Sequence, residues 1–188
     1  MSTERGLLCI WTGIAPEHEA DFNRWYDREH MQERVAIPGF QAARRFRAVD
    51  ASERPYLALY ATDGLAVFTS PAYRQAFTQQ TEWSLRNFAR MQHTQRRVGT
   101  LVLERGAGEG GALALLVVPP ALVDAAALQP RLDALLAQDD VIAASLLHTD
   151  AVLSTPLTAG AVPAAADGVV FVEATRAEAA RAAAQSLA

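Results

Sequence analysis

Hydrophobic residues in the first half of the chain follow spacings that predict strands and helices in a definite order. Apolar or alternating runs predict strands at residues 7–12, 40–49, 56–62 and 98–104. Helical spacing, with proline at favourable first positions, predicts helices at 16–35, 71–77 and 82–91. The first helix must end before Pro38, and Pro38-Gly39 suits a type II turn. The order β-α-β-β-α-β is the ferredoxin-like pattern.

The second half repeats this pattern in a weaker form. Its apolar spacing predicts strands at 112–118, 141–148 and 168–174 and helices at 123–138 and 176–186. The run 57-LALYATDGLA-66 is echoed by 169-VVFVEATRAEA-179, but no fourth strand follows the last helix. We therefore predict an α+β fold of two tandem ferredoxin-like units, the second degenerate. Each sheet would have one face without helices, and packing two such sheets together, within one chain or between two, would bury both faces.

Composition divides the chain at the glycine-rich stretch 106-GAGEGG-111, which we interpret as a linker between domains at 1–105 and 112–188. The first domain has a formal charge of +2, and the remainder, from Gly106 onward, has −6. Thirteen of the 14 aromatic residues precede Gly106. Because aromatic, arginine and histidine side chains shape and orient ligands, we expect any binding site in the first half.

Whole-chain composition excludes several classes of function. Cys9 is the single cysteine, so no internal disulfide forms, and the polar N-terminus carries no signal segment; we expect a cytoplasmic protein. A net charge of −4 lacks the excess of positive charge that is typical of nucleic-acid-binding proteins. No apolar stretch is long enough to span a membrane. All 17 basic residues are arginine, which excludes Schiff-base chemistry through lysine.

The most informative segment is the predicted first helix and the turn that follows it, 22-FNRWYDREHMQERVAIPGF-40. Phe22, Tyr26 and His30 recur every four residues and so share one stripe, beside which lie Trp25 and Glu29. The remaining polar positions are expected to face water: Asn23, Arg24, Asp27, Arg28, Gln32 and Arg34. Two interpretations of the histidine stay open: a half-buried residue with one hydrogen bond, or a proton-transfer group in a cleft between helix and sheet. The glutamate can equally pair with a neighbouring arginine.

The predicted strands add aromatic and cationic candidates. Tyr56 and Tyr60 share one face of their strand, and alternation places Arg44 and Arg45 on opposite faces of theirs. We expect one inward arginine to hold a carboxylate of the substrate and assign this to Arg45, although the pattern leaves open which of the two faces the helix.

Cofactor and metal sites find little support in the sequence. Glu29 and His30 diverge by about 100° around a helix and make a poor ligand pair. His30, His93 and His148 are haem-ligand candidates by residue type alone. The glycine-rich stretch leads into a predicted strand, whereas a dinucleotide-binding fingerprint leads into a helix. We predict neither a metal ion nor another cofactor.

The string WYDREHMQERVAIPGF, followed by RRF and then PYLALY, resembles the EthD-like proteins of the dimeric α+β barrel superfamily. The resemblance covers residues 6–104. It implies ferredoxin-like units whose sheets pack into a barrel, usually between subunits, so we expect a homodimer. The histidine of the family's helix corresponds to His30, and its turn to Pro38, Gly39 and Phe40. The superfamily includes cofactor-free monooxygenases, cyclases, isomerases, lyases and haem proteins, most of which act on small aromatic or lactone compounds.

Together these features predict a cofactor-independent enzyme, of isomerase, cyclase, monooxygenase or lyase type, in catabolism. Its substrate would be a small aromatic, lactone or keto-acid compound. His30 would be the general acid or base, Arg45 would hold an anionic group, and the pocket would be lined by Trp25, Tyr26, Tyr56 and Tyr60. The alternatives are a non-catalytic small-molecule-binding or accessory protein and a purely structural module.

Overall fold

The computed structural model describes residues 5–156 and 166–187. The chain divides into two compact units, and the boundary falls between Val98 and Gly99, inside strand β4 (Met91–Arg105). The two units are described separately below.

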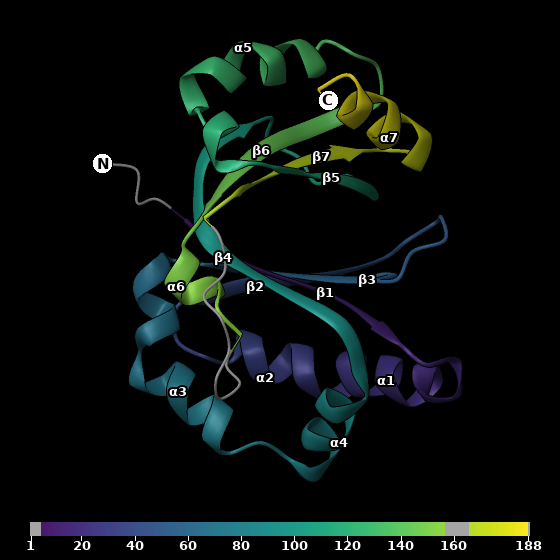
Figure 1. The fold of residues 1–188 in the computed structure, drawn as a ribbon, viewed down its shortest axis with the longest axis vertical. Helices are drawn as coiled ribbons and strands as arrows, with labels where there is room; N and C mark the ends of the chain where they lie inside the picture. Colours follow the sequence, from purple (N-terminus) through teal and green to yellow (C-terminus); the bar gives the residue numbers. More distant parts are fainter. Residues whose placement is uncertain (1–4, 157–165, 188) are drawn as a thin grey trace. The chain divides into compact units, whose positions relative to one another are not determined.

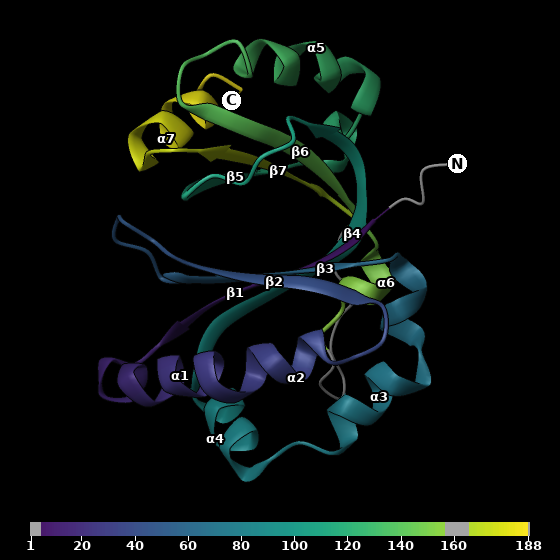
Figure 2. The same cartoon turned by 180° about the vertical axis from the view of Figure 1, so that it is seen from behind.

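The first unit contains a four-stranded antiparallel sheet with helices on one face (Figures 1 and 2). Its other strands are β1 (Gly6–Ile14), β2 (Phe40–Arg47) and β3 (Tyr56–Thr62). Its helical elements are η1 (Pro16–His18), α1 (Glu19–Trp25), the π-helix η2 (Tyr26–His30), α2 (Met31–Val35), η3 (Leu65–Thr69), α3 (Pro71–Thr78) and α4 (Glu82–Arg90). The strand order β2-β3-β1-β4 confirms the predicted ferredoxin-like arrangement.

Local sequence signals explain the ends of these helices. At the turn after α2, Gly39 has φ +91° and the Phe40 N–H donates to the Ile37 carbonyl at 3.0 Å, as the predicted type II turn requires. Ser70 and Thr81 begin α3 and α4, because each hydroxyl accepts a hydrogen bond from the backbone N–H three residues later.

Strand β4 is much longer than the predicted strand at 98–104. Of its first residues, MQHTQRR, all but Met91 are polar, and they therefore give no hydrophobic pattern. They are held beside β1 partly by polar contacts. The Thr12 hydroxyl lies 3.0 Å from the Gln92 carbonyl and 2.7 Å from the Thr94 hydroxyl.

The second unit has the strand order β4-β6-β7-β5. Its own elements are β5 (Ala112–Val118), η4 (Pro120–Leu122), α5 (Ala125–Leu135), β6 (Val141–Thr149), α6 (Ala151–Ser154), β7 (Gly168–Ala174) and α7 (Ala177–Gln185). The fourth strand that the sequence pattern lacks is supplied by the end of β4, where Gly99 pairs with Thr149 and Arg105 with Ala144. This strand lies beside β6, at the sheet edge opposite to the one that a ferredoxin-like fourth strand occupies.

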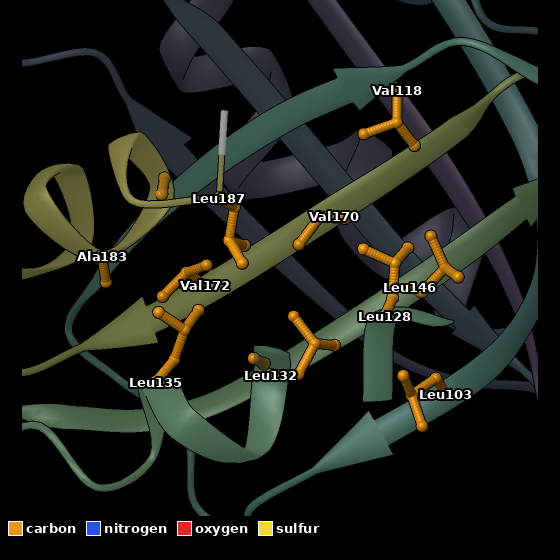
Figure 3. Close-up of a cluster of buried hydrophobic side chains, with 12 residues drawn as sticks. Leu103, Val118, Leu128, Leu132, Leu135, Leu146, Val170, Val172, Ala183 and Leu187 are labelled. Atoms are coloured by element: carbon orange, nitrogen blue, oxygen red, sulfur yellow. The ribbon is translucent and has the colours of Figure 1, made fainter. Parts of the chain in front are cut away.

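The core of the second unit is aliphatic. Leucines on the inner face of α5, among them Leu132 and Leu135, point toward valines of β7 such as Val172 (Figure 3). Branched and small side chains fill this layer, and none of its members is aromatic. The core therefore offers no ring face or polar end for binding a ligand, in contrast to the first unit.

Within residues 5–156 and 166–187, no helix combines the length and apolar character needed to cross a membrane.

Candidate functional site

The helix that carries the candidate residues changes its winding where they lie. The single helix predicted for 16–35 is a succession of η1, α1, η2 and α2, and η2 is a π-helix. Tyr26 and His30 are the buried residues of this π segment, and Phe22 and Trp25 are buried just before it. The predicted aromatic stripe is therefore buried as expected. Single π turns inside α-helices are frequently found at functional sites.

His30 lies in an aromatic cage. Its ring stacks on the Trp25 indole, with ring centroids 4.4 Å apart and an angle of 27° between planes. The rings of Tyr26 and Phe88 meet it edge to face at 5.1 and 5.4 Å, and Tyr60 lies beyond at 6.4 Å. The His30 Nδ1 atom is buried and has no hydrogen-bond partner among the residues that the structure describes. This is unusual, because buried side-chain nitrogen atoms are generally hydrogen-bonded.

Burial and charge keep this imidazole neutral. Burial lowers the pKa of His30 well below its ordinary value of 6.5, and the positive charges of Arg34 and Arg45 lower it further. A neutral imidazole has one N–H and one lone pair. His30 can therefore accept a proton or a hydrogen bond at neutral pH.

Two buried tyrosines adjoin the histidine. Burial raises the pKa of Tyr26, and it raises the pKa of Tyr60 well above 10, so both remain protonated phenols at neutral pH. Their hydroxyls are close enough to affect each other's pKa, but the Tyr60 hydroxyl makes no hydrogen bond of normal geometry within the described residues. A second polar atom next to His30 thus has no hydrogen bond of normal geometry among the described residues.

Arg34 corrects a prediction made from the sequence. It was expected to face water, but only 4% of it is exposed. Its Nη2 donates to the Ala76 carbonyl at 3.3 Å, its guanidinium carbon lies 5.2 Å from the Phe77 ring centroid, and its Nε is buried without a partner. Arg34 is four residues beyond His30 and so continues the spacing of Phe22, Tyr26 and His30. That continuation is the signal that could have identified it.

A β-bulge settles which arginine of β2 faces the helix. The register with β3 shifts between Phe40 and Ala42, which places Phe40 and Arg45 on one face; simple alternation places them on opposite faces. The Arg45 guanidinium lies 4.0 Å from the Tyr26 ring centroid. It also donates to Asp27 at 2.9 Å and to Asn23 at 2.8 Å, so part of its hydrogen-bonding capacity is used within the protein.

Tyr56 lies apart from the histidine cage. Its ring packs 5.2 Å from Phe22, and its hydroxyl donates to Glu19 and accepts from the Asn23 side chain. The structure thus brings His30, Trp25, Tyr26 and Tyr60 together, with Arg45 over Tyr26, and places Tyr56 at the other end of the stripe.

Glu29 contacts hydroxyl groups, and the arginine pairing that the sequence left open is not found among the described residues. Its carboxylate accepts hydrogen bonds from Thr81 at 2.6 Å and Ser84 at 3.2 Å, at the start of α4. The Ser84 hydroxyl in turn accepts from the Trp25 indole N–H at 3.0 Å. This chain of contacts orients the ring on which His30 stacks.

No three His, Cys, Asp or Glu side chains within the described part of the chain gather as a metal site would require. The charged groups that act on His30 are the guanidiniums of Arg34 and Arg45, whose positive charges would repel a metal cation.

Comparisons with known proteins show which solved structures share this fold. Neither a protein-family model nor a curated protein matches the chain by sequence. Among solved structures, an anthrone oxidase-like protein matches with a TM-score of 0.60 at 14% identity, over 97% of this chain and 84% of its own. A proposed monooxygenase from Lactobacillus acidophilus matches with a TM-score of 0.59 at 10% identity, over 97% of this chain and 82% of its own.

A third match shows how widely chemistry varies on this fold. A chlorite dismutase variant from Candidatus Nitrospira defluvii, in complex with cyanide, has a TM-score of 0.57 at 11% identity, over 100% of this chain and 83% of its own. At such identities the likeness establishes the fold and leaves the activity to the site. The chain therefore has the α+β fold of these structures, which are dimeric α+β barrel proteins.

Proposed function

We propose that the protein is an enzyme that removes a proton from a small aromatic, lactone or keto-acid compound, with His30 as the base. The observation that carries the proposal is the buried, neutral His30 ring, whose Nδ1 has no partner among the described residues. The rings that enclose it are flat and largely apolar, which is the chemistry that a pocket for a conjugated substrate requires.

The step transfers one proton to the imidazole. The bond between hydrogen and the carbon next to a carbonyl, or between hydrogen and a phenolic oxygen, breaks; its electron pair stays on the substrate as an enolate or phenolate. An imidazolium alone is disfavoured here by burial and by two guanidiniums. A substrate anion formed beside it offsets that cost, and the Tyr60 hydroxyl can donate a hydrogen bond to the developing oxyanion.

The names of two of the matched structures agree with a small organic substrate. One is described as anthrone oxidase-like and another as a proposed monooxygenase. An ionised aromatic or enolate is more electron-rich than its parent acid, so proton removal would also prepare a substrate for oxidation. Isomerisation, cyclisation and bond cleavage next to a carbonyl can begin from the same anion.

Exchange of carbon-bound hydrogen tests the proposal without knowledge of the final product. The protein is incubated in D₂O with β-keto acids, lactones and hydroxy-aromatic compounds, and proton NMR follows deuterium incorporation. We expect the wild type to accelerate exchange for a subset of compounds and His30→Gln to lose this acceleration by at least about a hundredfold. His148→Gln is the matched control, because that histidine is exposed and lies in the second unit.

Two results would count against the proposal. If His30→Gln exchanges as fast as the wild type, His30 is not the base. If compounds stabilise the wild type against heat but return without deuterium or chemical change, the protein binds small molecules and does not transform them.

A further inference from the structure

We propose that Arg34 binds a planar oxyanion of the ligand, so that the substrate is either a carboxylic acid or a compound that ionises in place. This inference rests on the proposed function, since it specifies the substrate class for the site around His30. It concerns a residue that the sequence pattern assigned to the surface.

The first observation is an unbalanced charge. Arg34 is only 4% exposed, and no carboxylate within the described residues forms an ion pair with it. Arg45, the other arginine whose charge acts on His30, forms an ion pair with Asp27. A buried charge is costly unless a counter-charge or a full set of hydrogen bonds accompanies it.

The second observation is unused hydrogen-bonding capacity. A guanidinium has five N–H donors, and the described contact of Arg34 is one long hydrogen bond from Nη2 to the Ala76 carbonyl. The Nε atom is buried and has no partner. Nε and Nη2 form the fork that binds both oxygens of a carboxylate, and Nη2 carries a second N–H besides the one that Ala76 accepts, so a planar anion can engage this edge.

The third observation is position. Arg34 follows His30 by four residues on the buried stripe, and its charge influences the titration of His30, Tyr26 and Tyr60. The neighbouring Glu33 forms no ion pair with Arg34 within the described residues, although the guanidinium lowers the pKa of Glu33 against the larger raising effects of burial and Glu29. The charge of Arg34 thus acts on the residues of the aromatic cage, where the substrate anion would form.

Nitrogen-15 NMR of the arginine side chains tests this directly. Each arginine gives an Nε–Hε signal, and the signal of Arg34 is identified by its loss in Arg34→Met. We expect benzoate to shift this signal and benzamide, its neutral isostere, to leave it unchanged. Arg34→Met should bind benzoate at least about tenfold more weakly than the wild type, and Arg34→Lys should restore binding in part.

Arg28→Met is the matched control. It removes the same charge from η2, the segment directly before α2. Because Arg28 is exposed, the benzoate affinity of this variant should equal that of the wild type. Far-UV circular dichroism checks the fold of each variant. If Arg34→Met fails to fold, the loss of a signal in Arg34→Lys identifies the Nε–Hε signal of Arg34. The wild-type titrations with benzoate and benzamide then decide whether Arg34 binds the anion.

A second probe separates the two sources of the anion. The neutral and ionised forms of 4-nitrophenol absorb at different wavelengths, so its ionisation on the protein can be read directly. If Arg34 stabilises an anion formed in place, bound 4-nitrophenol should ionise at a lower pH on the wild type than on Arg34→Met. Benzoate binding without this effect assigns Arg34 to a carboxylate carried by the substrate.

The two proposals fail in different ways. The anion proposal is overturned if neither probe shifts the Arg34 signal, if benzamide binds as well as benzoate, or if Arg34→Met binds both probes unchanged. The proton-transfer proposal is overturned if His30→Gln retains exchange activity. Benzoate binding at Arg34 would then persist without a basic role for His30.

Discussion

At the scale of single residues, the candidate site is marked by buried polar atoms that have no hydrogen bond of normal geometry among the described residues. Tyr60 and Tyr56 lie on the same face of β3, but their hydroxyls differ: that of Tyr60 has no partner of normal geometry among the described residues, and that of Tyr56 bonds to Glu19 and Asn23. A buried hydroxyl without a hydrogen-bond partner lowers the free energy of unfolding, whereas a hydrogen-bonded one raises it. The two tyrosines therefore form a matched pair.

We predict that Tyr60→Phe raises the free energy of unfolding by about 1 kcal/mol, because it removes an unsatisfied buried hydroxyl. Tyr56→Phe should lower it by about 1.5 kcal/mol, because a hydrogen bond to a carboxylate is lost. Urea titrations of both variants and the wild type measure the two changes. Equal destabilisation by both substitutions would mean that the Tyr60 hydroxyl is satisfied in solution, and its proposed contact with substrate would lose its basis.

His30 should make stability depend on pH. Its pKa in the folded protein is depressed by burial and then by Arg34 and Arg45, so below the ordinary value of 6.5 the unfolded chain takes up a proton that the folded protein does not. Stability should thus fall as the pH drops from about 7 to about 5, by up to about 1.4 kcal/mol per pH unit from this residue.

His30→Gln isolates that contribution. Because the other ionisable groups are shared, we expect the variant's free energy of unfolding to decline less steeply than the wild type's over the same pH range. Parallel curves from urea unfolding would show that His30 takes up its proton equally well in the folded state, and the neutral-base argument would fail.

At the scale of elements, the sequence predicts the buried stripe and the Pro-Gly turn because each depends on local spacing. It misses what depends on irregular backbone or on distant partners. The bulge after Phe40 selects Arg45 as the inward arginine, and alternation alone could not reveal it. Glu29 is satisfied by hydroxyls more than 50 residues away, and the polar start of β4 carries no apolar pattern. Arg34 was within reach of the same four-residue spacing, but its charge argued for the surface.

The turn before β2 should be sensitive to substitution because it sets the start of that strand. Gly39 has φ +91°, and a Cβ atom there would lie 2.5 Å from Val67 Cγ2. We predict that Gly39→Ala lowers the free energy of unfolding by about 1–2 kcal/mol, through left-handed backbone strain and this contact.

Gly111→Ala is the control, because a Cβ at this position would meet its nearest neighbour at 3.8 Å and the backbone has no positive φ. Thermal unfolding compares the two variants. A Gly39→Ala protein as stable as Gly111→Ala would show that the turn and Val67 adjust without cost.

At the scale of the whole molecule, one strand belongs to both units. Strand β4 lies beside β1 in the first sheet and pairs with β6 in the second, without a break at Val98 and Gly99. The two cores differ in kind: the aliphatic core lies in the second unit, whereas all three tryptophans lie in the first. Tryptophan fluorescence therefore reports on the first unit, and far-UV circular dichroism reports on both.

We predict that Leu132→Ala, in the core of the second unit, lowers the unfolding midpoint seen by both probes together. Leu132 is fully buried between α5 and the sheet, so its truncation should cost about 2–5 kcal/mol. Loss of the second sheet would release the end of β4, and because a strand gains its stability from continuous pairing, the part beside β1 should be destabilised with it.

Leu122→Ala, at an exposed leucine in the same unit, should change either midpoint little. A fluorescence midpoint that stays at the wild-type value while the dichroism midpoint falls would mean that the units unfold separately, and that the site around His30 does not depend on the second half for its stability.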